Sequence, residues 1–358
     1  MSSVGRSKWP IEVIRWPPAQ RSAELPAMKT PAIVFSDKNA VSICDLQIPL
    51  PRKHEIQVRS RYSTISAGTE SWLLRGLLTP SPLRFPCVPG YQRVGIVTPV
   101  GPGVSGWRIG DRALALTGMW STPDVERALG AHVGFANVPT AFSYHLPEDV
   151  ADIDGSVTVV AQVGYSAATR INCEPGDWVL VYGDGLVGQC SAQVARARGA
   201  RVVLVGHRRE RLELAMQYSA DAVINSNVDN VSVALRRIVG SNTVPIVLDS
   251  VQTPASLKQY IDLVHRGTGQ IVYNGFNPDA RWADLSLLQQ RELTAHFVLH
   301  WTRERIEATL ALMGSQKLSI RPLITHLVPY TRGPDMYRLI TEKSEPFLGI
   351  TLDWTGVD

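Results

Sequence analysis

Three glycines with the spacing G-x-G-x-x-G are the feature of this chain that most directly suggests chemistry. Gly183, Gly185 and Gly188 follow the apolar run 179–182 and precede a helix-like segment at 189–198. Between a strand and a helix, the first glycine permits a tight turn and the second lets the backbone approach a pyrophosphate. The third allows the helix to pack closely on the sheet. The pattern therefore predicts a dinucleotide site, in preference to a glycine turn that binds nothing.

Backbone groups near this turn are the expected contacts of the dinucleotide. The helix would begin near Leu186 and Val187, where free N–H groups and the positive end of the helix dipole can face the phosphates. A later strand-like run, 270–274, ends in Asn274 and is followed by Gly275. Ligands of such sheets bind beyond the carboxyl ends of the strands, so we expect these two residues to contact the cofactor as well.

The end of the second strand predicts which dinucleotide binds. The apolar run 202–205 is followed by Gly206, His207, Arg208 and Arg209. A protein that prefers NAD normally carries an acidic residue here, which binds the ribose hydroxyls. A glycine instead leaves room for a 2′-phosphate, and two guanidinium groups can bind that phosphate. An exposed helix start without a ligand explains the arginines less well, because cations oppose the dipole there. We therefore expect NADP(H).

Composition indicates a two-lobed globular enzyme. Of the 358 residues, 44% are hydrophobic and 19% are charged, and 36 basic against 32 acidic residues give a net charge of +4. No clustered basic stripe suggests nucleic acid binding, and no apolar run reaches membrane-spanning length. The four cysteines are widely separated and include no C-x-x-C pair. This usage favours a reducing cytoplasm, so we expect a cytoplasmic protein with a small-molecule substrate, no nucleic acid partner and no membrane partner.

The order of elements predicts an α/β fold. Short strands and turns, with no helix, are expected from about 31 to 111, and from about 155 strands alternate with helices. Such a βαβ series predicts a doubly wound parallel sheet, the Rossmann architecture, with helices on both faces. Residues 1–28 are interpreted as an N-terminal extension of unknown use.

Four further motifs carry a family resemblance. They are Ile65-Ser-Ala-Gly-Thr-Glu70, Val88-Pro-Gly-Tyr-Gln-Arg-Val-Gly-Ile-Val97, Gly106-Trp-Arg-Ile-Gly-Asp-Arg112 and Gly164-Tyr-Ser-Ala-Ala168. In this order, and with the glycine motif, they resemble the medium-chain dehydrogenase/reductase superfamily of alcohol dehydrogenases and quinone reductases. The resemblance covers nearly all of 29–353. Locally, 66–70 with 89–91 is similar to the bacteriochlorophyllide dehydrogenase-type reductases.

The resemblance implies a division into domains. Residues 29–155 would form a GroES-like, partly open β-barrel that carries the catalytic groups, and 156–298 the Rossmann domain. Residues 299–358 would return to the catalytic domain. The cleft between the domains would hold the nicotinamide and the substrate. Relatives pair their nucleotide domains through edge strands, so the resemblance also implies a homodimer.

The resemblance further implies where a catalytic zinc ion would bind, and the residues at those positions are unsuitable. The three ligand positions fall on Ala67, Tyr91 and, approximately, Val159, while the glutamate after the second position is Gln92. Catalytic zinc requires thiolate, imidazole or carboxylate ligands. The four-cysteine structural zinc lobe is also missing, because no cysteine lies between 87 and 173. We therefore expect no bound metal.

Without zinc, a hydroxyl must stabilise or protonate the negative charge that hydride transfer builds on the acceptor. The resemblance points to Thr69, whose counterpart begins a proton relay, and to Tyr91, which replaces a metal-binding histidine. Each has a structural alternative: Thr69 could bond its own backbone, and Tyr91 could fill the vacated metal space. Glu70 aligns with a structural acidic position. Weaker candidates nearby are Tyr62, Ser63 and Ser66.

Two tryptophans are candidates for the substrate wall. Trp72 lies three residues beyond Thr69, where zinc-dependent relatives often carry a relay histidine, and its bulk suggests an apolar or planar wall. Trp120, next to Met119, could line the same cleft. The alternative for each is a core side chain, which is the more frequent role of an aromatic residue.

Three functions remain open at this point. The leading one is a zinc-independent, NADPH-dependent oxidoreductase that interconverts a carbonyl and an alcohol on a small or mid-sized organic molecule. The second is reduction of a conjugated C=C or C=N bond, as in quinone, enoyl and iminium reductases. The third is a non-catalytic regulator that binds NADPH.

Overall fold

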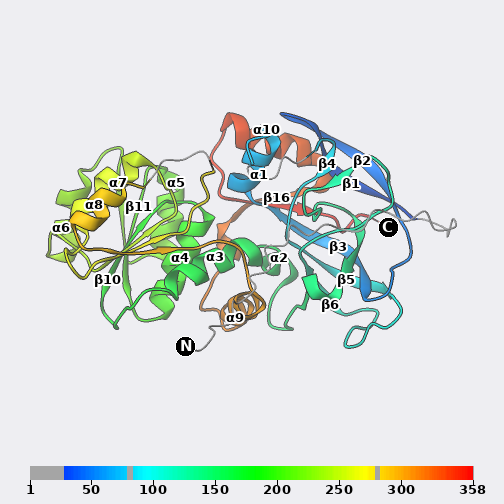
Figure 1. The fold of residues 1–358 in the computed structure, drawn as a ribbon, viewed down its shortest axis with the longest axis horizontal. Coiled ribbons are helices and arrows are strands. Elements are labelled where there is room, and N and C mark those ends of the chain that lie inside the picture. The colour runs from blue at the N-terminus through cyan, green and yellow to red at the C-terminus, as the bar shows by residue number, and fades with distance from the viewer. Residues whose placement is uncertain (1–27, 79–83, 279–282, 358) are drawn as a thin grey trace, which may run out of the picture.

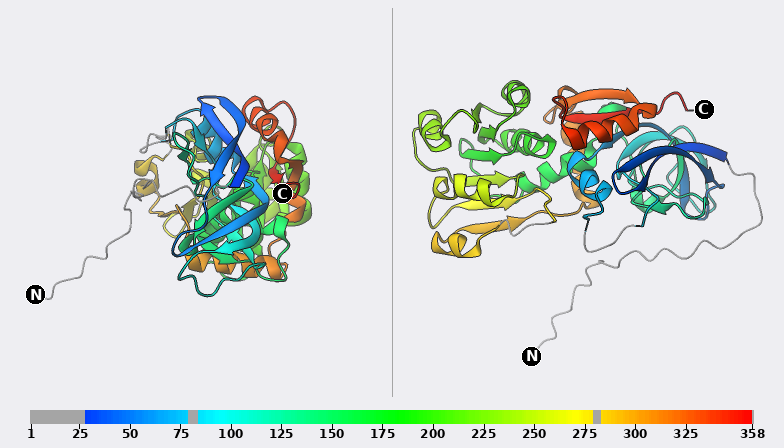
Figure 2. Two further views of the ribbon diagram at one scale, coloured as in Figure 1. Left: turned by 90° about the vertical axis from the view of Figure 1, so that its right-hand side faces the viewer. Right: turned by 90° about the horizontal axis from the view of Figure 1, so that it is seen from above.

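The computed structural model describes residues 28–78, 84–278 and 283–357. The expected N-terminal extension therefore lies outside the described residues, except for Met28. A region built on a parallel sheet and a region rich in antiparallel strands lie side by side along the long axis of the molecule (Figures 1 and 2). No helix in the described ranges is long and apolar enough to cross a bilayer.

Six parallel strands of the described chain form one sheet in the order β12-β11-β10-β13-β14-β15. Counted along the chain, this is the 3-2-1-4-5-6 order of the Rossmann fold, so the expected doubly wound sheet is confirmed. The strands are β10 (Trp178–Tyr182), β11 (Arg201–Gly206), β12 (Ala222–Asn225), β13 (Ile246–Asp249), β14 (Gln270–Tyr273) and β15 (Thr294–Phe297).

Helices cover both faces of this sheet because successive side chains of a strand point to opposite faces. Val179 and Val181 of β10 pack in one core with residues of α3, α4 and α5. Leu180 and Tyr182 pack in another core with residues of α6, α7 and α8. The helices are α3 (Thr158–Ala168), α4 (Leu186–Ala197), α5 (Arg209–Leu214, continued by a π-helical turn, Ala215–Ser219), α6 (Val231–Val239), α7 (Pro254–Tyr260) and α8 (Leu285–Gln290).

The second region is a GroES-like, partly open β-barrel made of two sheets. The larger sheet has the order β16-β17-β3-β5-β6-β9, with β8 also paired to β3, and the smaller has the order β2-β1-β4-β7. The strands are β1 (Met28–Asp37), β2 (Ala40–Ile48), β3 (Glu55–Ile65), β4 (Cys87–Val88), β5 (Arg93–Val100), β6 (Arg112–Ala115), β7 (Glu126–Arg127), β8 (Phe135–Pro139), β9 (Ser143–His145), β16 (Ile324–Pro329) and β17 (Gly349–Asp353).

The C-terminal segment returns to the barrel. Strand β17 pairs antiparallel with β3, with Thr351 opposite Thr64, and α10 lies against α1 (Figure 1). The exact domain boundaries stay a prediction. The remaining helices are α1 (Ala67–Leu74), α2 (Asp152–Gly155), α9 (Arg303–Gly314), α10 (Gly333–Glu342) and the 3-10 helices Thr140–Phe142, Ile261–Leu263, Arg321–Leu323 and Tyr330–Arg332.

Helix α1 departs from the expectation of strands and turns alone before position 111. The Glu70 N–H donates to the Ser66 carbonyl over 2.9 Å, which closes the first helical turn. The Glu70 carboxylate accepts the Ser66 N–H over 2.8 Å and so satisfies a donor at the helix start. This backbone and side-chain closure turns the expected 65–70 turn into the beginning of a helix.

Candidate active site

The glycine turn after β10 is shaped by two close backbone approaches. Gly183 has a φ of 116°, and an added Cβ there would lie 2.2 Å from Ser250 Oγ. An added Cβ at Gly188 would lie 1.9 Å from the Gly183 carbonyl oxygen, so α4 packs directly on the turn. Gly185 caps α4 and has open space in front of it. The expected contacts that line a cleft at this point are Gly183, Gly185, Leu186, Val187 and Gly188.

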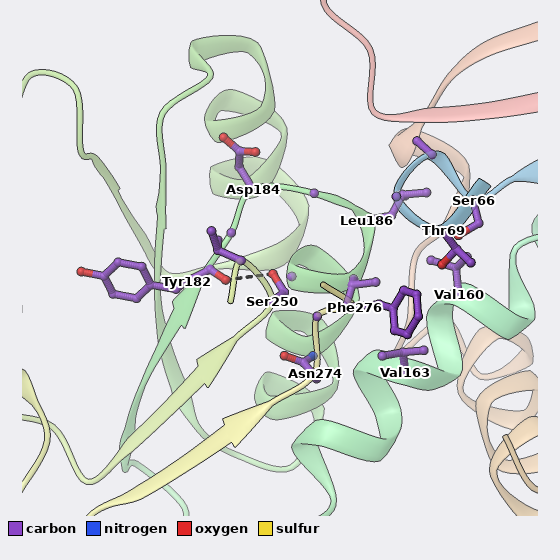
Figure 3. A pocket seen from close by; sticks show the side chains of 18 of the residues that line it. Ser66, Thr69, Val160, Val163, Tyr182, Asp184, Leu186, Ser250, Asn274 and Phe276 are labelled. Carbon is purple, nitrogen blue, oxygen red and sulfur yellow. Dashed lines mark hydrogen bonds between the residues drawn. The ribbon is translucent and has the colours of Figure 1, made fainter. Parts of the chain in front are cut away.

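The cleft has a volume of about 1010 Å³ and extends from the glycine turn to α1. It lies where the strand order reverses between β10 and β13, the position at which doubly wound sheets bind their ligands. Figure 3 shows Asp184 towards one end, the hydroxyl groups of Ser66 and Thr69 at the other, and Phe276 between them. The cleft therefore joins a polar nucleotide end to a hydroxyl-bearing end in the barrel.

At the nucleotide end, Asp184 fills the space beside Gly206. A Cβ added to Gly206 would lie 2.5 Å from the Cβ of Asp184. Asp184 Oδ2 accepts the backbone N–H groups of His207 and Arg208, each over 3.0 Å. The carboxylate of the glycine turn is thereby tied to the end of β11.

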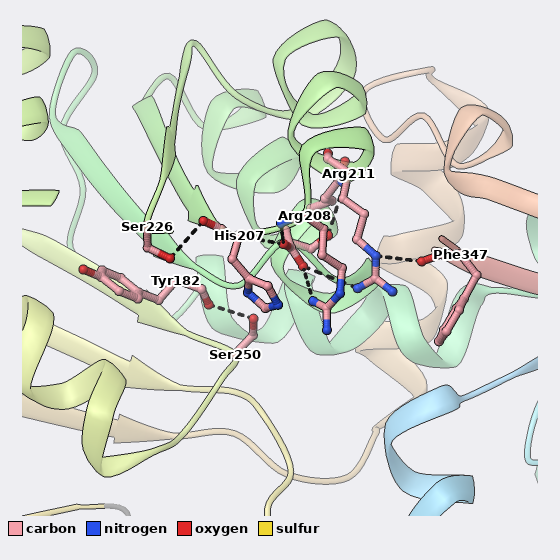
Figure 4. Close-up of polar contacts among 10 residues, drawn as sticks. Tyr182, His207, Arg208, Arg211, Ser226, Ser250 and Phe347 are labelled. Carbon is pink, nitrogen blue, oxygen red and sulfur yellow. Dashed lines mark hydrogen bonds and ion pairs between the residues drawn. The ribbon is translucent and has the colours of Figure 1, made fainter. Parts of the chain in front are cut away.

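Two guanidinium groups converge on the other oxygen of Asp184, and Figure 4 shows these side chains, Arg208 and Arg211, next to each other. Arg208 Nη1 donates to Asp184 Oδ1 over 2.9 Å, and Arg211 Nη1 lies 3.4 Å from the same oxygen. Burial alone would raise the pKa of Asp184, but the backbone N–H groups and the two cations outweigh it and lower that pKa. Two cations share one carboxylate, so this end of the cleft carries a net positive charge.

Arg209 does not reach the cleft. Its side chain is 83% exposed and pairs with Glu213 over 2.8 Å. Arg211 instead lines the cleft together with His207 and Arg208. Residues three apart lie on one side of a helix start, which brings 208 and 211 together and turns 209 away. The structure thus replaces Arg209 with Arg211 in the expected arginine pair.

Two buried amide oxygens near the middle of the cleft have no hydrogen-bond partner among the described residues. They are Gln162 Oε1 and Asn274 Oδ1. The amide nitrogens of the same side chains donate to the His300 carbonyl over 3.1 Å and to Ser191 Oγ over 2.9 Å. Unpaired buried acceptors cost stability, so a ligand that brings hydrogen-bond donors, such as an amide or a ribose, fits here. Asn274 and Gly275 both line the cleft, at the position expected for them.

Three hydroxyl groups gather at the barrel end of the cleft. The Tyr91 phenol donates to Ser66 Oγ, and the Thr69 hydroxyl also interacts with the phenol. All three residues line the cleft. Burial raises the pKa of Tyr91 to about 12; the hydrogen bond to Ser66 opposes this shift, and the charge of Glu70 adds to it. Tyr91 is therefore protonated at neutral pH and can donate a hydrogen bond.

A buried network holds this hydroxyl cluster in place. The Glu70 carboxylate accepts hydrogen bonds from the Ser66 N–H and from the Tyr337 hydroxyl of α10. It also lies beside His132, whose Nε2 is 3.0 Å from Glu70 Oε2. His132 Nδ1 lies 2.8 Å from Ser63 Oγ. Glu70 thus joins the start of α1 to the C-terminal segment and does not line the cleft in the described structure, which agrees with its expected structural role.

The two tryptophans expected at the substrate wall lie elsewhere in the described structure. Trp72 is packed under the Arg75 guanidinium, whose carbon lies 4.5 Å from the ring centroid. Trp120 donates its indole N–H to the Val125 carbonyl over 2.9 Å. Neither lines the cleft, whereas Trp301 does, and its ring stacks on Tyr91 with centroids 6.2 Å apart and planes 20° apart.

The three positions that the resemblance assigns to zinc ligands carry no thiolate, imidazole or carboxylate. Ala67, Tyr91 and Val159 all line the same end of the cleft. Gln92 Oε1 accepts the N–H groups of Val159 and Val160 over 2.9 and 3.1 Å, so it anchors α3. No group of three histidine, cysteine, aspartate or glutamate side chains in the described ranges could hold a metal ion.

Comparison with known proteins places these features in context. Residues 187–315 match the family described as zinc-binding dehydrogenase. A D-xylulose reductase of Saccharomyces cerevisiae is 24% identical over 322 residues, which cover 82% of this chain and 89% of the relative. An Escherichia coli oxidoreductase of unknown specificity has a similar structure, with a TM-score of 0.81 and 22% identity over 91% of this chain and 99% of the other. An alcohol dehydrogenase of Escherichia coli CFT073, complexed with NADH, has a TM-score of 0.78 and 21% identity, and the match covers 91% of this chain and 99% of the other.

Proposed function

We propose that this chain is an NADP(H)-dependent oxidoreductase that interconverts a carbonyl and an alcohol without a catalytic metal ion. We also propose that it is related to the zinc-type alcohol dehydrogenases of the medium-chain dehydrogenase/reductase superfamily. One observation carries the proposal. A single cleft joins the arginine pair beside Gly206 to the Tyr91 hydroxyl cluster. The alcohol and polyol dehydrogenase names among the relatives support this class of reaction.

The nucleotide end supports a phosphorylated cofactor. Gly206 leaves room for the Asp184 side chain, and Arg208 and Arg211, which both contact that carboxylate, supply charge-assisted donors for a phosphate. The N–H groups at the start of α4 suit the pyrophosphate. The unpaired oxygens of Gln162 and Asn274 suit the donors of the nicotinamide half.

The reaction would use the hydroxyl cluster as its proton donor. When bound, NADPH supplies a hydride to the carbonyl carbon. Tyr91 would then exchange its hydrogen bond to Ser66 Oγ for one to the carbonyl oxygen and donate its phenolic hydrogen there, where negative charge develops; the Ser66 hydroxyl would donate to the resulting phenolate until solvent reprotonates it after product release. Because an alkoxide is a stronger base than a phenolate, the proton passes to the product even though burial raises the pKa of Tyr91. Ser66 and Thr69 would orient the phenol, and the apolar walls would exclude water. Alcohol oxidation would run the same steps in reverse.

The proposed independence from zinc rests on the donor set. Alanine and valine side chains cannot bind a metal, and those residues occupy two of the three ligand positions. The family match covers 187–315, whereas positions 67, 91 and 159 all precede it. The zinc in the family description therefore does not bear on these three residues.

We propose a homodimer formed through β15. This strand lies at the edge of the six-stranded sheet, and Leu299, which follows it, is 57% exposed. Light scattering of the purified protein tests the proposed dimer. The cytoplasmic location expected from cysteine usage stays a prediction.

Turnover and metal content together test the proposed function. NADPH and NADH oxidation would be followed with a panel of aldehydes, ketones, enones and imines, while metal content is measured on the same preparation. We expect carbonyl reduction that is faster with NADPH than with NADH and that proceeds without a stoichiometric metal ion. Selective reduction of the enones or imines would favour the conjugated-bond alternative. NADPH binding without any turnover would favour the regulator, and a metal that restores activity would overturn the proposal.

A further inference from the structure

We infer that the substrate is an apolar compound that bears a planar ring and one reacting polar group, not a polyol. The inference rests on the proposed function and adds the chemical class of its substrate. It comes from the barrel end of the cleft, the part that the nucleotide contacts leave free. This part, here called the substrate end, is defined by Ser66, Thr69, Tyr91, Leu129, Val163 and Trp301.

The walls of the substrate end are apolar side chains from separate parts of the chain, and Phe276 lies at its border with the nucleotide end. Leu129 from the loop after β7 is 41% exposed, and Phe276 from the segment after β14 is 40% exposed. Figure 3 shows the Phe276 ring directed towards Val160 and Val163 of α3. Large apolar side chains that converge on a cleft while still exposed indicate a surface that an apolar ligand covers.

The substrate end has few side chains that can form hydrogen bonds with a substrate, and they suit one reacting oxygen. The described charged side chains that line the cleft, Asp184, Arg208 and Arg211, lie at the nucleotide end. At the substrate end the polar side chains are the three hydroxyls and His300, with Gln162, whose unpaired oxygen suits the nicotinamide half, beside the His300 carbonyl; the Tyr91 hydroxyl is taken by the reacting oxygen. A polyol would bury several further hydroxyl groups against valine and leucine, and each unpaired hydroxyl weakens binding about 10-fold.

The aromatic pair indicates the shape of the ligand. The rings of Tyr91 and Trp301 are nearly parallel, with planes 20° apart and centroids 6.2 Å apart, and both residues line the cleft. Their ring faces and edges offer stacking and edge contacts to a planar ring. A ring held there would bring its carbonyl substituent to the Tyr91 phenol, the donor that the proposed reaction requires.

Steady-state kinetics with matched substrates test the inference. Benzaldehyde and acetophenone would be compared with cyclohexanecarbaldehyde and with the ketoses D-xylulose and D-fructose, all with NADPH. We expect kcat/KM to be highest for the aryl carbonyls and at least about 100-fold lower for the ketoses, because two or more of their hydroxyls stay unpaired. Trp301→Leu should lower kcat/KM for the aryl compounds about 10-fold and change cyclohexanecarbaldehyde less.

The control is Trp107→Leu, since Trp107 stacks on His145 outside the cleft with ring centroids 3.8 Å apart. This variant should leave all substrates and the NADPH dissociation constant unchanged. Ketoses reduced as well as aryl carbonyls, or a Trp301→Leu effect equal for all substrates, would overturn the inference and leave the proposed function intact. Turnover of no carbonyl compound despite NADPH binding would overturn the proposed function and, with it, this inference.

Discussion

The side chain of Asp184 occupies the place that a side chain on Gly206 would need. A Cβ at position 206 would lie 2.5 Å from Asp184 Cβ and 2.7 Å from Asp184 Oδ2. In NAD-preferring relatives of this fold an acidic residue stands at the end of the second strand. Here an acidic residue reaches the same region from the glycine turn and is already bonded to backbone N–H groups and arginines.

This relationship predicts that Gly206→Asp will not convert the cofactor preference to NADH. The new side chain would collide with Asp184 and place a second carboxylate beside the first. We expect the free energy of unfolding to fall by about 1–3 kcal/mol, the usual cost of overpacking. NADPH binding should weaken with no gain for NADH, as measured by fluorescence titration. Gly206→Ala separates the steric effect from the charge effect, and an NADH affinity above that of the unaltered protein would contradict the prediction.

The arginine pair predicts a cofactor-specific loss of affinity. Arg208→Ala and Arg211→Ala should each weaken NADPH binding about 10- to 100-fold, because a hydrogen bond to a charged group contributes about 1.5–3 kcal/mol. NADH binding should change little, since it lacks the 2′-phosphate. Arg209→Ala is the matched control, because Arg209 is exposed and pairs with Glu213. An equal loss for both cofactors, or an equal loss in Arg209→Ala, would remove the phosphate assignment.

The parts of this site that could be predicted from the sequence are those fixed by local spacing. Gly183 and Gly188 lie in one turn and one helix start, so their spacing was sufficient to predict the turn. Strands β10, β11 and β14 could be recognised from the runs 179–182, 202–205 and 270–274, because each is a short, mainly apolar run bounded by turn signals. The position of Gly206 at a strand end followed from the same pattern.

The parts that could not be predicted depend on the direction in which side chains point and on contacts between segments that are far apart in the sequence. Arg211 rather than Arg209 faces the cleft because of where α5 begins, and helix boundaries are the least certain part of a sequence-based assignment. Trp301 meets Tyr91 from a segment 210 positions later in the chain, which no local motif indicates. Trp72 lies near Thr69 in sequence, but packs with Arg75. The expectation that Trp72 lines the substrate wall rests on its closeness to Thr69 in the sequence, whereas contacts between distant segments decide which side chains form that wall.

His207 predicts a pH dependence of NADPH binding. Burial lowers the pKa of this imidazole, and the charge of Arg208 lowers it further, so His207 is neutral in the free protein at neutral pH. A bound phosphate favours the cationic form, so NADPH binding takes up a proton and tightens as pH falls from 8 towards 6.5. The change should reach at most about 5-fold, because an exposed ion pair contributes about 1 kcal/mol or less. NADH should lack this dependence, and so should His207→Gln; a dependence that persists in the variant would contradict the assignment.

Tyr91 predicts a loss of turnover that is independent of pH. Tyr91→Phe should lower kcat for carbonyl reduction about 100-fold or more, the usual contribution of a positioned proton donor. The NADPH dissociation constant should stay unchanged. Because the pKa of Tyr91 is raised to about 12, its proton is retained up to at least pH 10, and kcat should show no basic limb from this group below that pH. Tyr144→Phe, outside the cleft, is the control, and normal turnover in Tyr91→Phe would assign Tyr91 to packing.

We expect that removing the buried charge of Arg93 will increase the stability of the folded protein. The side chain is fully buried on β5, and none of its three guanidinium nitrogens has a hydrogen-bond partner among the described residues. Burial lowers the pKa of Arg93 to about 9. Replacing a buried charge by an apolar side chain of similar length is often stabilising by about 1–4 kcal/mol, so Arg93→Met should raise the free energy of unfolding in urea at pH 7.

A variant that keeps the charge identifies the cause of this gain. The guanidinium is cationic at pH 7, so the folded protein bears the cost of burying an unpaired charge. Arg93→Lys, which keeps the charge, should therefore show no advantage at pH 7, whereas Arg93→Met should. A less stable Arg93→Met variant at pH 7 would mean that the guanidinium is held by a bound anion or by water.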